Sequence, residues 1–387
     1  MNILITGGGI ANKGAQAMLF ITVEQMQKRF PQDRVIVLTV TDSDFSNYRF
    51  DVKRVSLYAI KYIAKSINIL KLALHRVNPK QIIDIENVFR NARLLVDISG
   101  YALGSNWADG IVDYYLSCFE CAKRFDVPVY IMPQSFGPLD YPKDSVMMKR
   151  IASTMAYPKI IYAREKEGYD MLTERFELKN VRTSCDMVLR TQSASPLNIY
   201  KRLPQEIRLP NIGNNSVAII PNVRICDHIG LDETIRYYCE IAREVLKTGD
   251  TLYILHHSSE DAPLCDQIMQ SLGANNRVVL LSDDYDCFKY EALVQRFDYI
   301  IASRYHAIVH ALKNCVPCIA VGWATKYHEL LTLFDLQEYV FDVRDEVGEN
   351  DFQESIANMN ATYKVCANRI RKIMEGIQQN DLFDCIG

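Results

Sequence analysis

Residues 2–29 have the sequence NILITGGGIANKGAQAMLFITVEQMQKR, and this opening pattern indicates the fold. A short β-branched run at 2–6 is followed by three glycines and then by an amphipathic run at 15–29, as in a strand, a tight loop and a helix. The same alternation recurs along the chain, which predicts parallel α/β sheets with helices on both faces. We predict strands at 2–6, 34–40, 93–98, 127–132, 159–163, 216–221, 251–256, 277–281, 298–302 and 316–321, and helices at 15–29, 109–124, 231–247 and 287–296.

The chain of 387 residues is long enough for two such domains, and the predicted strands are many for one sheet. Residues 191–215 contain three prolines and many polar side chains, which is typical of a linker. We therefore predict two Rossmann-like domains facing a central cleft: an N-terminal domain at 1–192, a linker at 193–215 and a C-terminal domain at 216–387. Ligands of such sheets bind at the carboxyl ends of the strands, so we expect the functional site in the cleft.

Composition excludes several classes of protein. Apolar residues make up 49% and charged residues 24% of the chain, as in an ordinary folded protein rather than a disordered one. A net charge of −3, from 44 basic and 47 acidic residues, gives no reason to expect a nucleic-acid partner. No apolar run is long enough to span a membrane, and the first residues lack the pattern of a signal peptide. Because the eleven cysteines are scattered through apolar segments, we expect a cytoplasmic protein without disulfides.

Residues 53–80 stand apart because they contain seven Lys or Arg and no Asp or Glu. Six apolar residues recur at helical spacing within this segment, so we predict one basic amphipathic helix across it. Lys61, Lys65 and Arg76 fall on the opposite side of that helix. Two interpretations stay open: a crossover helix that packs on the sheet with a basic outer face, or an interfacial helix that contacts anionic lipid.

The glycine-rich loop at 7–16, GGGIANKGAQ, opens the first predicted helix. The dinucleotide pattern G-x-G-x-x-G would need a glycine where Asn12 stands, and the phosphate-loop pattern G-x-x-x-x-G-K-[ST] is not met either. A nicotinamide cofactor is therefore not expected. Asn12 and Gln16 can hydrogen-bond a sugar or an anion at the helix N-terminus, or they simply cap a tight turn.

Polar and aromatic residues cluster after the predicted strand at 93–98. Tyr101, Asn106 and Trp107 belong to the residue types that stack on a hexose and hydrogen-bond to it. Asp97, at the strand end, can act as a base toward a sugar hydroxyl. The alternative for Trp107 is an ordinary place in the core.

Two further strand ends carry candidate residues. Gln134 and Ser135 lie in the sequence PQSFGP that follows one strand, and Arg164 follows the next. Arg164 either binds an anion or pairs with a neighbouring carboxylate. Asp186, which ends a short run, is a minor candidate in the same half of the chain.

The most informative sequence is SRYHAIVHAL at 303–312, which follows an apolar strand and opens a helix. Arg304 offers the planar fork that suits a carboxylate or phosphate, and the helix N-terminus favours the same charge. His306 can act as an acid or a base near neutral pH. Lys326 can serve as a second cation, or it is a solvated residue at a helix start. His310 shares a helix face with His306, but no companion carboxylate follows, so we expect no metal.

Together these motifs resemble those of the polysaccharide pyruvyl transferase family along most of the chain (residues 3–340). The most specific part is SRYHA at 303–307 with the residues that follow it. The sequence differs from the family on the expected acceptor side, where Ala15 stands in place of a usual acidic residue and SGY at 99–101 replaces a glycine triplet. The matching residues are Asn12, Gly14, Ala17, Leu19, Gln134, Ser135, Gly137, Pro138, Ala163, Arg164, Glu165, Ser303, Arg304, His306, Ala307, Ala311, Leu312, Pro317 and Lys326.

The resemblance implies a two-domain GT-B fold and a transfer reaction. Members of the family transfer the enolpyruvyl unit of phosphoenolpyruvate to a sugar, two hydroxyls of which become a cyclic pyruvate ketal while phosphate leaves. The expected catalytic residues are then His306, for proton transfer, and Asp97. Arg304 is expected to bind the donor anion with Arg164 and Lys326 as supporting cations, and no metal or other cofactor is required. The expected acceptor-side residues are Asn12, Gln16, Tyr101, Asn106, Trp107, Gln134 and Ser135.

The acceptor implied by the resemblance is a hexose such as galactose in a lipid-linked or polysaccharide repeat unit, as in capsule or exopolysaccharide synthesis. A polyprenyl-diphosphate-linked acceptor would place the protein at the inner face of the membrane, which the basic segment 53–80 would suit. Two alternatives use the same residues. One is a nucleotide-sugar-dependent GT-B glycosyltransferase, in which the cations hold a diphosphate, and the other is a non-catalytic sugar-binding protein. Donor preference and phosphate release distinguish them.

Overall fold

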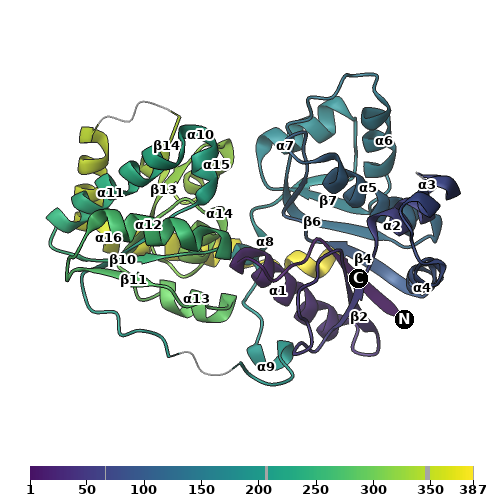
Figure 1. Ribbon diagram of the computed structural model, residues 1–387, viewed down its shortest axis with the longest axis horizontal. Coiled ribbons are helices and arrows are strands. Elements are labelled where there is room, and N and C mark those ends of the chain that lie inside the picture. The colour runs from purple at the N-terminus through teal and green to yellow at the C-terminus, as the bar shows by residue number, and fades with distance from the viewer. Residues whose placement is uncertain (66, 205–207, 345–348, 387) are drawn as a thin grey trace.

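The chain folds around two parallel sheets that lie side by side, as the computed structural model shows for residues 1–65, 67–204, 208–344 and 349–386 (Figure 1). This confirms the predicted fold class. The first sheet has the order β3 (Asp51–Arg54), β2 (Arg34–Thr39), β1 (Asn2–Thr6), β4 (Ala92–Asp97), β6 (Val129–Phe136), β7 (Ile160–Ala163) and β8 (Val181–Thr183), with β5 (Tyr101–Leu103) paired to β6. The second has the order β11 (Val278–Leu281), β10 (Thr251–Leu255), β9 (Ser216–Ile220), β12 (Tyr299–Ala302), β13 (Cys318–Gly322) and β14 (Val340–Asp342).

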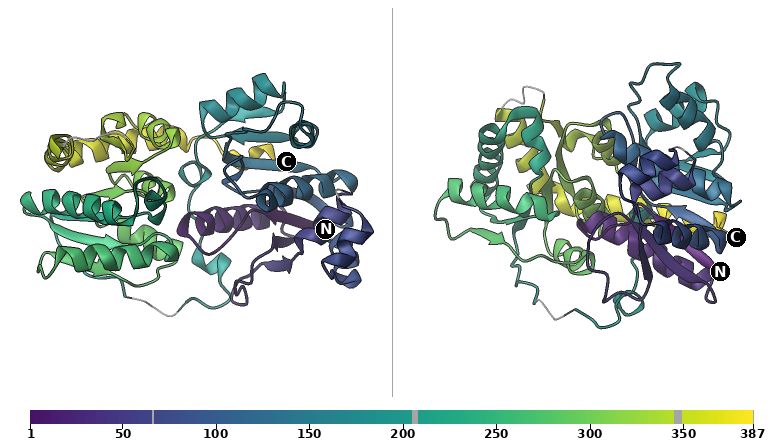
Figure 2. Two further views of the ribbon diagram at one scale, coloured as in Figure 1. Left: turned by 45° about the horizontal axis from the view of Figure 1, so that its top comes forward. Right: turned by 45° about the vertical axis from the view of Figure 1, so that its right-hand side comes forward.

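Helices cover the faces of both sheets (Figures 1 and 2). None of the helices in the described ranges is both long and apolar enough to cross a bilayer. The first part of the chain forms α1 (Lys13–Arg29), α2 (Leu57–Ile63), α3 (Ile69–Leu74), α4 (Pro79–Arg90), α5 (Asp109–Arg124), α6 (Val146–Met155), α7 (Lys166–Asp170), α8 (Met187–Arg190) and α9 (Pro196–Ile199). The second part forms α10 (Cys226–Ile229), α11 (Leu231–Lys247), α12 (Ala262–Leu272), α13 (Cys287–Val294), α14 (Tyr305–Lys313), α15 (Thr325–Thr332) and α16 (Glu349–Ile377).

The central strands are buried on both faces, as their continuous apolar sequences predict. In β1, Leu4 pairs with Ile36 on one side and with Leu95 on the other. Leu4 belongs to one hydrophobic core, whereas its neighbours Ile3 and Ile5 belong to another that continues into the second domain. Because this second core spans both domains, apolar burial as well as polar contacts holds them together.

The predicted single helix at 53–80 is wrong, because β3, α2, α3 and the start of α4 share this segment. The side chains of Asn68 and Asn78 cap the backbone N–H groups of α3 and α4. Lys65 and Arg76 have left-handed backbones, with φ of 60° and 49°, and each lies just after a helix. Local helix-ending geometry therefore outweighs the regular apolar spacing from which one helix was predicted.

The end of the chain returns to the first domain (Figure 2). After α16 a short turn, Leu382–Cys385, buries Phe383 completely. Arg29 of α1 donates to the Phe383 carbonyl at 3.3 Å and pairs with Asp381 at 2.5 Å. The predicted C-terminal domain, 216–387, thus has its last turn against the first domain.

Candidate functional site

The carboxyl ends of strands from both sheets meet between the two domains. Arg164 follows β7 of the first sheet, whereas His306 begins α14 after β12 of the second. His306 Nε2 lies 3.4 Å from Asp186 Oδ2, and Lys326 Nζ of α15 lies 6.0 Å from the centre of the Tyr101 ring. Residues that are far apart in the sequence, several of them predicted site residues, therefore form one cluster between the domains.

Asp186 links the cations of this cluster. It is fully buried at the N-terminus of α8, where its Oδ1 accepts a hydrogen bond from Val188 N at 2.9 Å. Arg164 Nη1 donates to its Oδ2 at 2.6 Å, and His306 approaches the same oxygen. Burial by itself would raise the pKa of Asp186, but His306 and Arg164 more than offset this and hold it below the usual range. The carboxylate is therefore ionised and offers its negative charge to both cationic side chains.

Arg164 is held rigidly in the first domain. Its Nη2 donates to Gly100 O at 2.9 Å and to Ser135 Oγ at 2.7 Å, and its guanidinium lies 4.7 Å from the centre of the Tyr305 ring. Burial opposes the charge, but Tyr305, Glu165 and Asp186 raise the pKa of Arg164 above its ordinary value. Arg164 thus pairs with a carboxylate, one of its two predicted roles; a direct contact with an anionic ligand stays a prediction.

Arg304 is already compensated by acidic side chains. Its Nε and Nη2 donate to the two oxygens of Asp261 at 2.8 and 2.5 Å, and Nη2 also donates to Glu260 at 2.6 Å. Asp261 is fully buried and is fixed by hydrogen bonds from Val223 N and Ser258 N. The arginine therefore braces the turn that carries His306, and its predicted binding of a donor anion stays a prediction.

Lys326 is the cation of the cluster for which we find no carboxylate partner within the described residues. Its Nζ lies 6.0, 5.5 and 5.6 Å from the ring centres of Tyr101, Tyr305 and Tyr327. Burial lowers the pKa of Lys326 to about 8, and the positive charge of Arg164 adds to this effect. A partly desolvated ammonium held by aromatic faces is a ready contact for an anion.

Gly14 allows the start of α1 to meet His306. A Cβ built at Gly14 would lie 2.1 Å from His306 Cγ, so any larger residue would displace the ring. Asn12 Oδ1 accepts a hydrogen bond from Ala15 N at 2.8 Å and caps the helix. The loop from the first strand therefore closes one side of the histidine, and Asn12 takes the capping role that was one of its two predicted alternatives.

Asp97 lies at the end of β4 and is buried. It accepts hydrogen bonds from Thr6 Oγ1 at 2.7 Å, from Ser99 Oγ at 2.9 Å and from Gln134 Nε2 at 3.0 Å. Burial raises the pKa of Asp97 although these hydrogen bonds favour the ionised form. A base with a raised pKa can accept a proton, but its oxygens are occupied in this arrangement.

A cavity of about 200 Å³ opens beside Asp97. Aromatic and apolar side chains form most of its wall, including Tyr101, Trp107, Tyr114 and Tyr115. The rings of Tyr101 and Trp107 are 5.4 Å apart, and Trp107 is 37% exposed, so it is not a core residue. Such a wall suits the apolar face of a sugar ring.

The other predicted acceptor-side residues have separate places. Gln16 Oε1 accepts a hydrogen bond from Cys287 N at 2.6 Å and so joins the domains. Ser135 Oγ donates to Glu165 Oε1 at 2.9 Å, within the Arg164 network. Asn106 is exposed, near the rim formed by Trp107.

Sequence reasoning missed Tyr305 and Asp261. Tyr305 contacts both Arg164 and Lys326, yet it occupies the variable position of the SRYHA motif. Asp261 lies in the turn after β10, and its only sequence signal is a polar run, SSED, that ends a strand. In the described part of the chain, no group of three or more His, Cys, Asp or Glu is placed to hold a metal.

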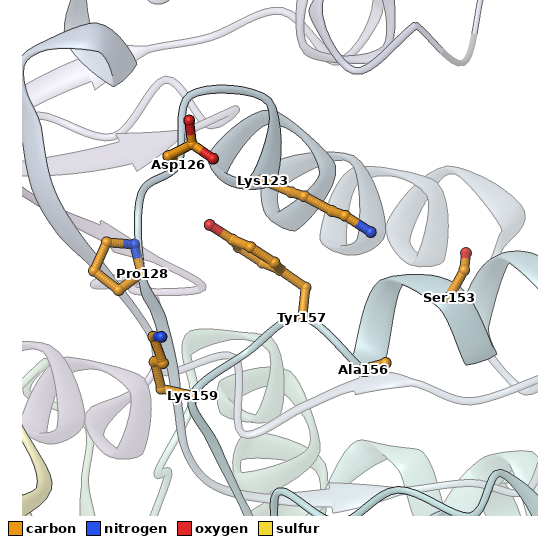
Figure 3. Close-up of a pocket in the computed structure, with 7 residues that line it drawn as sticks. All are labelled: Lys123, Asp126, Pro128, Ser153, Ala156, Tyr157 and Lys159. Carbon is orange, nitrogen blue, oxygen red and sulfur yellow. The ribbon is translucent and has the colours of Figure 1, made fainter.

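A larger cavity, of about 570 Å³, lies elsewhere (Figure 3). Lys123, Asp126, Tyr157 and Lys159 are among its lining residues, around the start of β6 and β7. This is the amino-terminal edge of the sheet, opposite to the edge where ligands of such folds bind. No predicted site residue lines it, so we place the functional site between the domains.

The chain was also compared with known protein families and structures. The model of the polysaccharide pyruvyl transferase family matches residues 12–325. That range includes Arg164, Asp186, Arg304 and His306 and ends one residue before Lys326. No curated protein sequence matches the chain.

Solved structures with the same fold are distant in sequence. Staphylococcus aureus MnaA, determined with UDP, has a TM-score of 0.61 at 12% identity, with 100% of this chain and 94% of that one covered. UDP-GlcNAc 2-epimerase from Neisseria meningitidis, bound to UDP-GlcNAc, has a TM-score of 0.56 at 12% identity, with 98% of this chain and 100% of that one covered. The spinosyn rhamnosyltransferase SpnG, complexed with thymidine diphosphate, has a TM-score of 0.53 at 11% identity, with 97% of this chain and 96% of that one covered. These likenesses establish a GT-B-like fold.

Proposed function

The chain belongs to the polysaccharide pyruvyl transferase family, and from that premise we propose that it transfers the pyruvyl group of phosphoenolpyruvate to two hydroxyls of a sugar. Family membership makes it a pyruvyl transferase of polysaccharide biosynthesis. The donor, the acceptor and the residue roles are the proposed part.

The observation that carries this proposal is Lys326, a buried cation held among tyrosine rings with no carboxylate ion pair in the described residues, in the same cluster as His306. Phosphoenolpyruvate carries a carboxylate and a phosphate, and it needs a cation that is not already paired. Arg164 and Arg304 are paired with Asp186 and Asp261, whereas Lys326 is surrounded by tyrosine rings. We therefore assign Lys326 the principal contact with the donor, and Arg164 and Arg304 supporting roles.

In the proposed reaction His306 gives a proton to the methylene carbon of the donor, which creates oxocarbenium character at C2. A sugar hydroxyl then attacks C2 and loses its proton, and the C2–O bond to phosphate breaks. A second hydroxyl closes the ketal and loses its proton as well. One of these two protons replaces the one His306 gave, and the phosphate takes the other, so the step is balanced. Asp186 Oδ2 lies 3.4 Å from His306 Nε2 and helps to position the ring.

The cavity beside Asp97 is the proposed acceptor subsite. Its aromatic wall and the exposed edge of Trp107 suit a hexose such as galactose. Asp97 would relay one of the two hydroxyl protons, the one that ends on the phosphate, once the acceptor displaces one of its donors. We propose that the sugar belongs to a lipid-linked or polysaccharide repeat unit of a capsule or exopolysaccharide, and that the protein works at the inner face of the membrane.

Incubation of the protein with phosphoenolpyruvate and a panel of nitrophenyl hexosides, followed by mass spectrometry, tests this function. We expect a pyruvate ketal on at least one hexoside and an equal release of phosphate. His306→Gln should abolish both, while His328→Gln, an exposed histidine in α15, should retain them. Ketal formation by His306→Gln would remove this histidine from the mechanism.

A nucleotide-sugar-dependent glycosyltransferase is the second candidate. It is favoured by the structures of the same fold that contain UDP or thymidine diphosphate. In that case Lys326 and the start of α14 would hold a diphosphate. Sugar transfer from a UDP- or GDP-sugar without any use of phosphoenolpyruvate would make this the leading function.

A further inference from the structure

The short helix α3 presents apolar side chains to solvent at the end of the molecule far from the second sheet (Figures 1 and 2). Ile69, Leu70 and Leu74 are 65%, 75% and 76% exposed, and Leu72 is the buried residue that anchors the helix. Large apolar residues so exposed and so close together are unusual on a folded surface and mark a contact site.

Exposed cations surround these apolar residues. Lys65 and Lys71, Arg76 and Lys80 are all exposed, and none has an ion pair within the described residues. Other basic residues of the same segment are paired, as Lys53 is with Asp84 at 3.1 Å and Lys61 is with Asp113. The chain has no Asp or Glu between Asp51 and Asp84, so the segment from Lys65 to Lys80 carries positive charge only.

We propose that the α3 surface, defined as Ile69, Leu70, Leu74, Lys65, Lys71, Arg76 and Lys80, docks on an anionic lipid bilayer. A bilayer surface offers negative headgroups for the cations and an acyl boundary for the apolar side chains, and a short helix can lie in that interface. A second copy of the chain fits less well, because pairing this surface with itself would bring like charges together.

The helix that precedes the α3 surface packs against a helix that lines the proposed acceptor cavity. The preceding helix, α2, packs on α5, where Arg124 Nη1 donates to Ile63 O at 2.6 Å and Cys121 Sγ contacts Ile60 O at 3.4 Å. Helix α5 also supplies Tyr114 and Tyr115 to the cavity wall. Docking through α3 would hold the cavity in a fixed relation to the bilayer. The docking itself does not rest on the proposed donor or acceptor.

Flotation of the full chain with lipid vesicles tests the inference. We expect binding to vesicles that contain phosphatidylglycerol and little binding to pure phosphatidylcholine. The double variant Leu70→Glu, Leu74→Glu should weaken binding at least about tenfold. Replacing all four cations by Gln should have an effect at least as large, since each cation near an anionic surface raises the affinity for the membrane several-fold. High salt should weaken the wild type as well, because it screens the charges.

Matched controls place the same changes elsewhere. Val146→Glu with Leu197→Glu changes two exposed apolar residues, and Gln at Lys159, Lys179, Lys364 and Lys372 removes four exposed cations. Both controls should bind vesicles like the wild type. Equal binding of the α3 variants and the wild type, or no binding of the wild type to anionic vesicles, would overturn the proposal. A wild-type dimer that the α3 variants convert to monomer, without vesicle binding, would assign the surface to a second copy.

A thermal shift with phosphoenolpyruvate separates docking from the proposed function. An α3 variant that loses vesicle binding but retains the shift has lost docking alone. A wild type that binds vesicles and shows no shift retains docking while the donor assignment fails.

Discussion

At the residue scale, the contact between Gly14 and His306 explains why the first loop matters for a histidine near the other end of the chain. The loop matches neither the dinucleotide-binding pattern nor the phosphate-loop pattern, yet Gly14 is required there for a steric reason. The cap from Asn12 then fixes the start of α1 against the ring.

We expect Gly14→Ala to lower turnover by at least about a hundredfold and to destabilise the protein by roughly 1–3 kcal/mol, because the added Cβ overlaps the His306 ring. Gly9→Ala is the matched control, since a Cβ at Gly9 meets no atom within 4 Å. Turnover and thermal unfolding measure the two effects. Normal turnover in Gly14→Ala would mean that the ring need not sit at the start of α1.

The pH dependence of donor binding should report Lys326. Its pKa of about 8 means that the ammonium form, which attracts the donor, is lost as pH rises through that value. The KM for phosphoenolpyruvate should therefore rise above about pH 8. In Lys326→Arg the charge persists, so the rise should vanish. An unchanged KM profile in the arginine variant would show that another group titrates.

At the element scale, the short helix α8 places Asp186 between two cations of the site. Asp186→Asn should destabilise the protein by about 3–5 kcal/mol, because it leaves the buried Arg164 without its nearest carboxylate. Asp227→Asn, at an exposed carboxylate, is the control. Unfolding by denaturant measures the stability of both variants. A loss of stability below about 1 kcal/mol in Asp186→Asn would show that the fold does not depend on the pairing of Arg164 with α8.

The same carboxylate gives a pH signature. The pKa of Asp186 is lower in the folded chain than in the unfolded one, so its contribution to stability is present above about pH 4 and is lost as pH falls further. The acid limb of the stability curve should therefore be shallower in Asp186→Asn than in the wild type.

The sequence predicts long elements better than short ones. Apolar runs such as 216–221 and the amphipathic run at 231–247 correspond closely to β9 and α11. β3, β5, β8 and β14 escape prediction because they have only three or four residues, so they carry little pattern. The segment 53–80 misleads for the opposite reason, since its spacing is regular but its backbone turns at Lys65 and Arg76.

The site could be predicted as a set of residues but not as a set of partners. The motif at 303–307 identifies Arg304 and His306, and the sequence places them at a strand end. That Arg304 is occupied by Asp261, and that Asp186 approaches His306, depends on how two distant segments meet. No spacing rule within one sequence gives that information.

At the scale of the whole molecule, the two domains are joined by a shared core and by the end of the chain. Phe383→Ala should cost about 3–5 kcal/mol, because this fully buried ring fills a place in the first domain from the far end of the chain. Gln379→Ala, at an exposed position, should change stability by less than about 0.5 kcal/mol. Unfolding in guanidinium measures the stability of both variants. If Phe383→Ala is nearly as stable as the wild type, the last turn does not hold the domains together.

The central claim is that Lys326 and its neighbours bind phosphoenolpyruvate. It is tested most directly by thermal unfolding with phosphoenolpyruvate or UDP, in the wild type, in Lys326→Met and in the exposed control Lys372→Met. A ligand at a hundred times its dissociation constant raises the free energy of unfolding by about 2.7 kcal/mol. We predict stabilisation by phosphoenolpyruvate alone in the wild type and in Lys372→Met, and its loss in Lys326→Met. Stabilisation by UDP alone, or full stabilisation of Lys326→Met by phosphoenolpyruvate, would contradict the account.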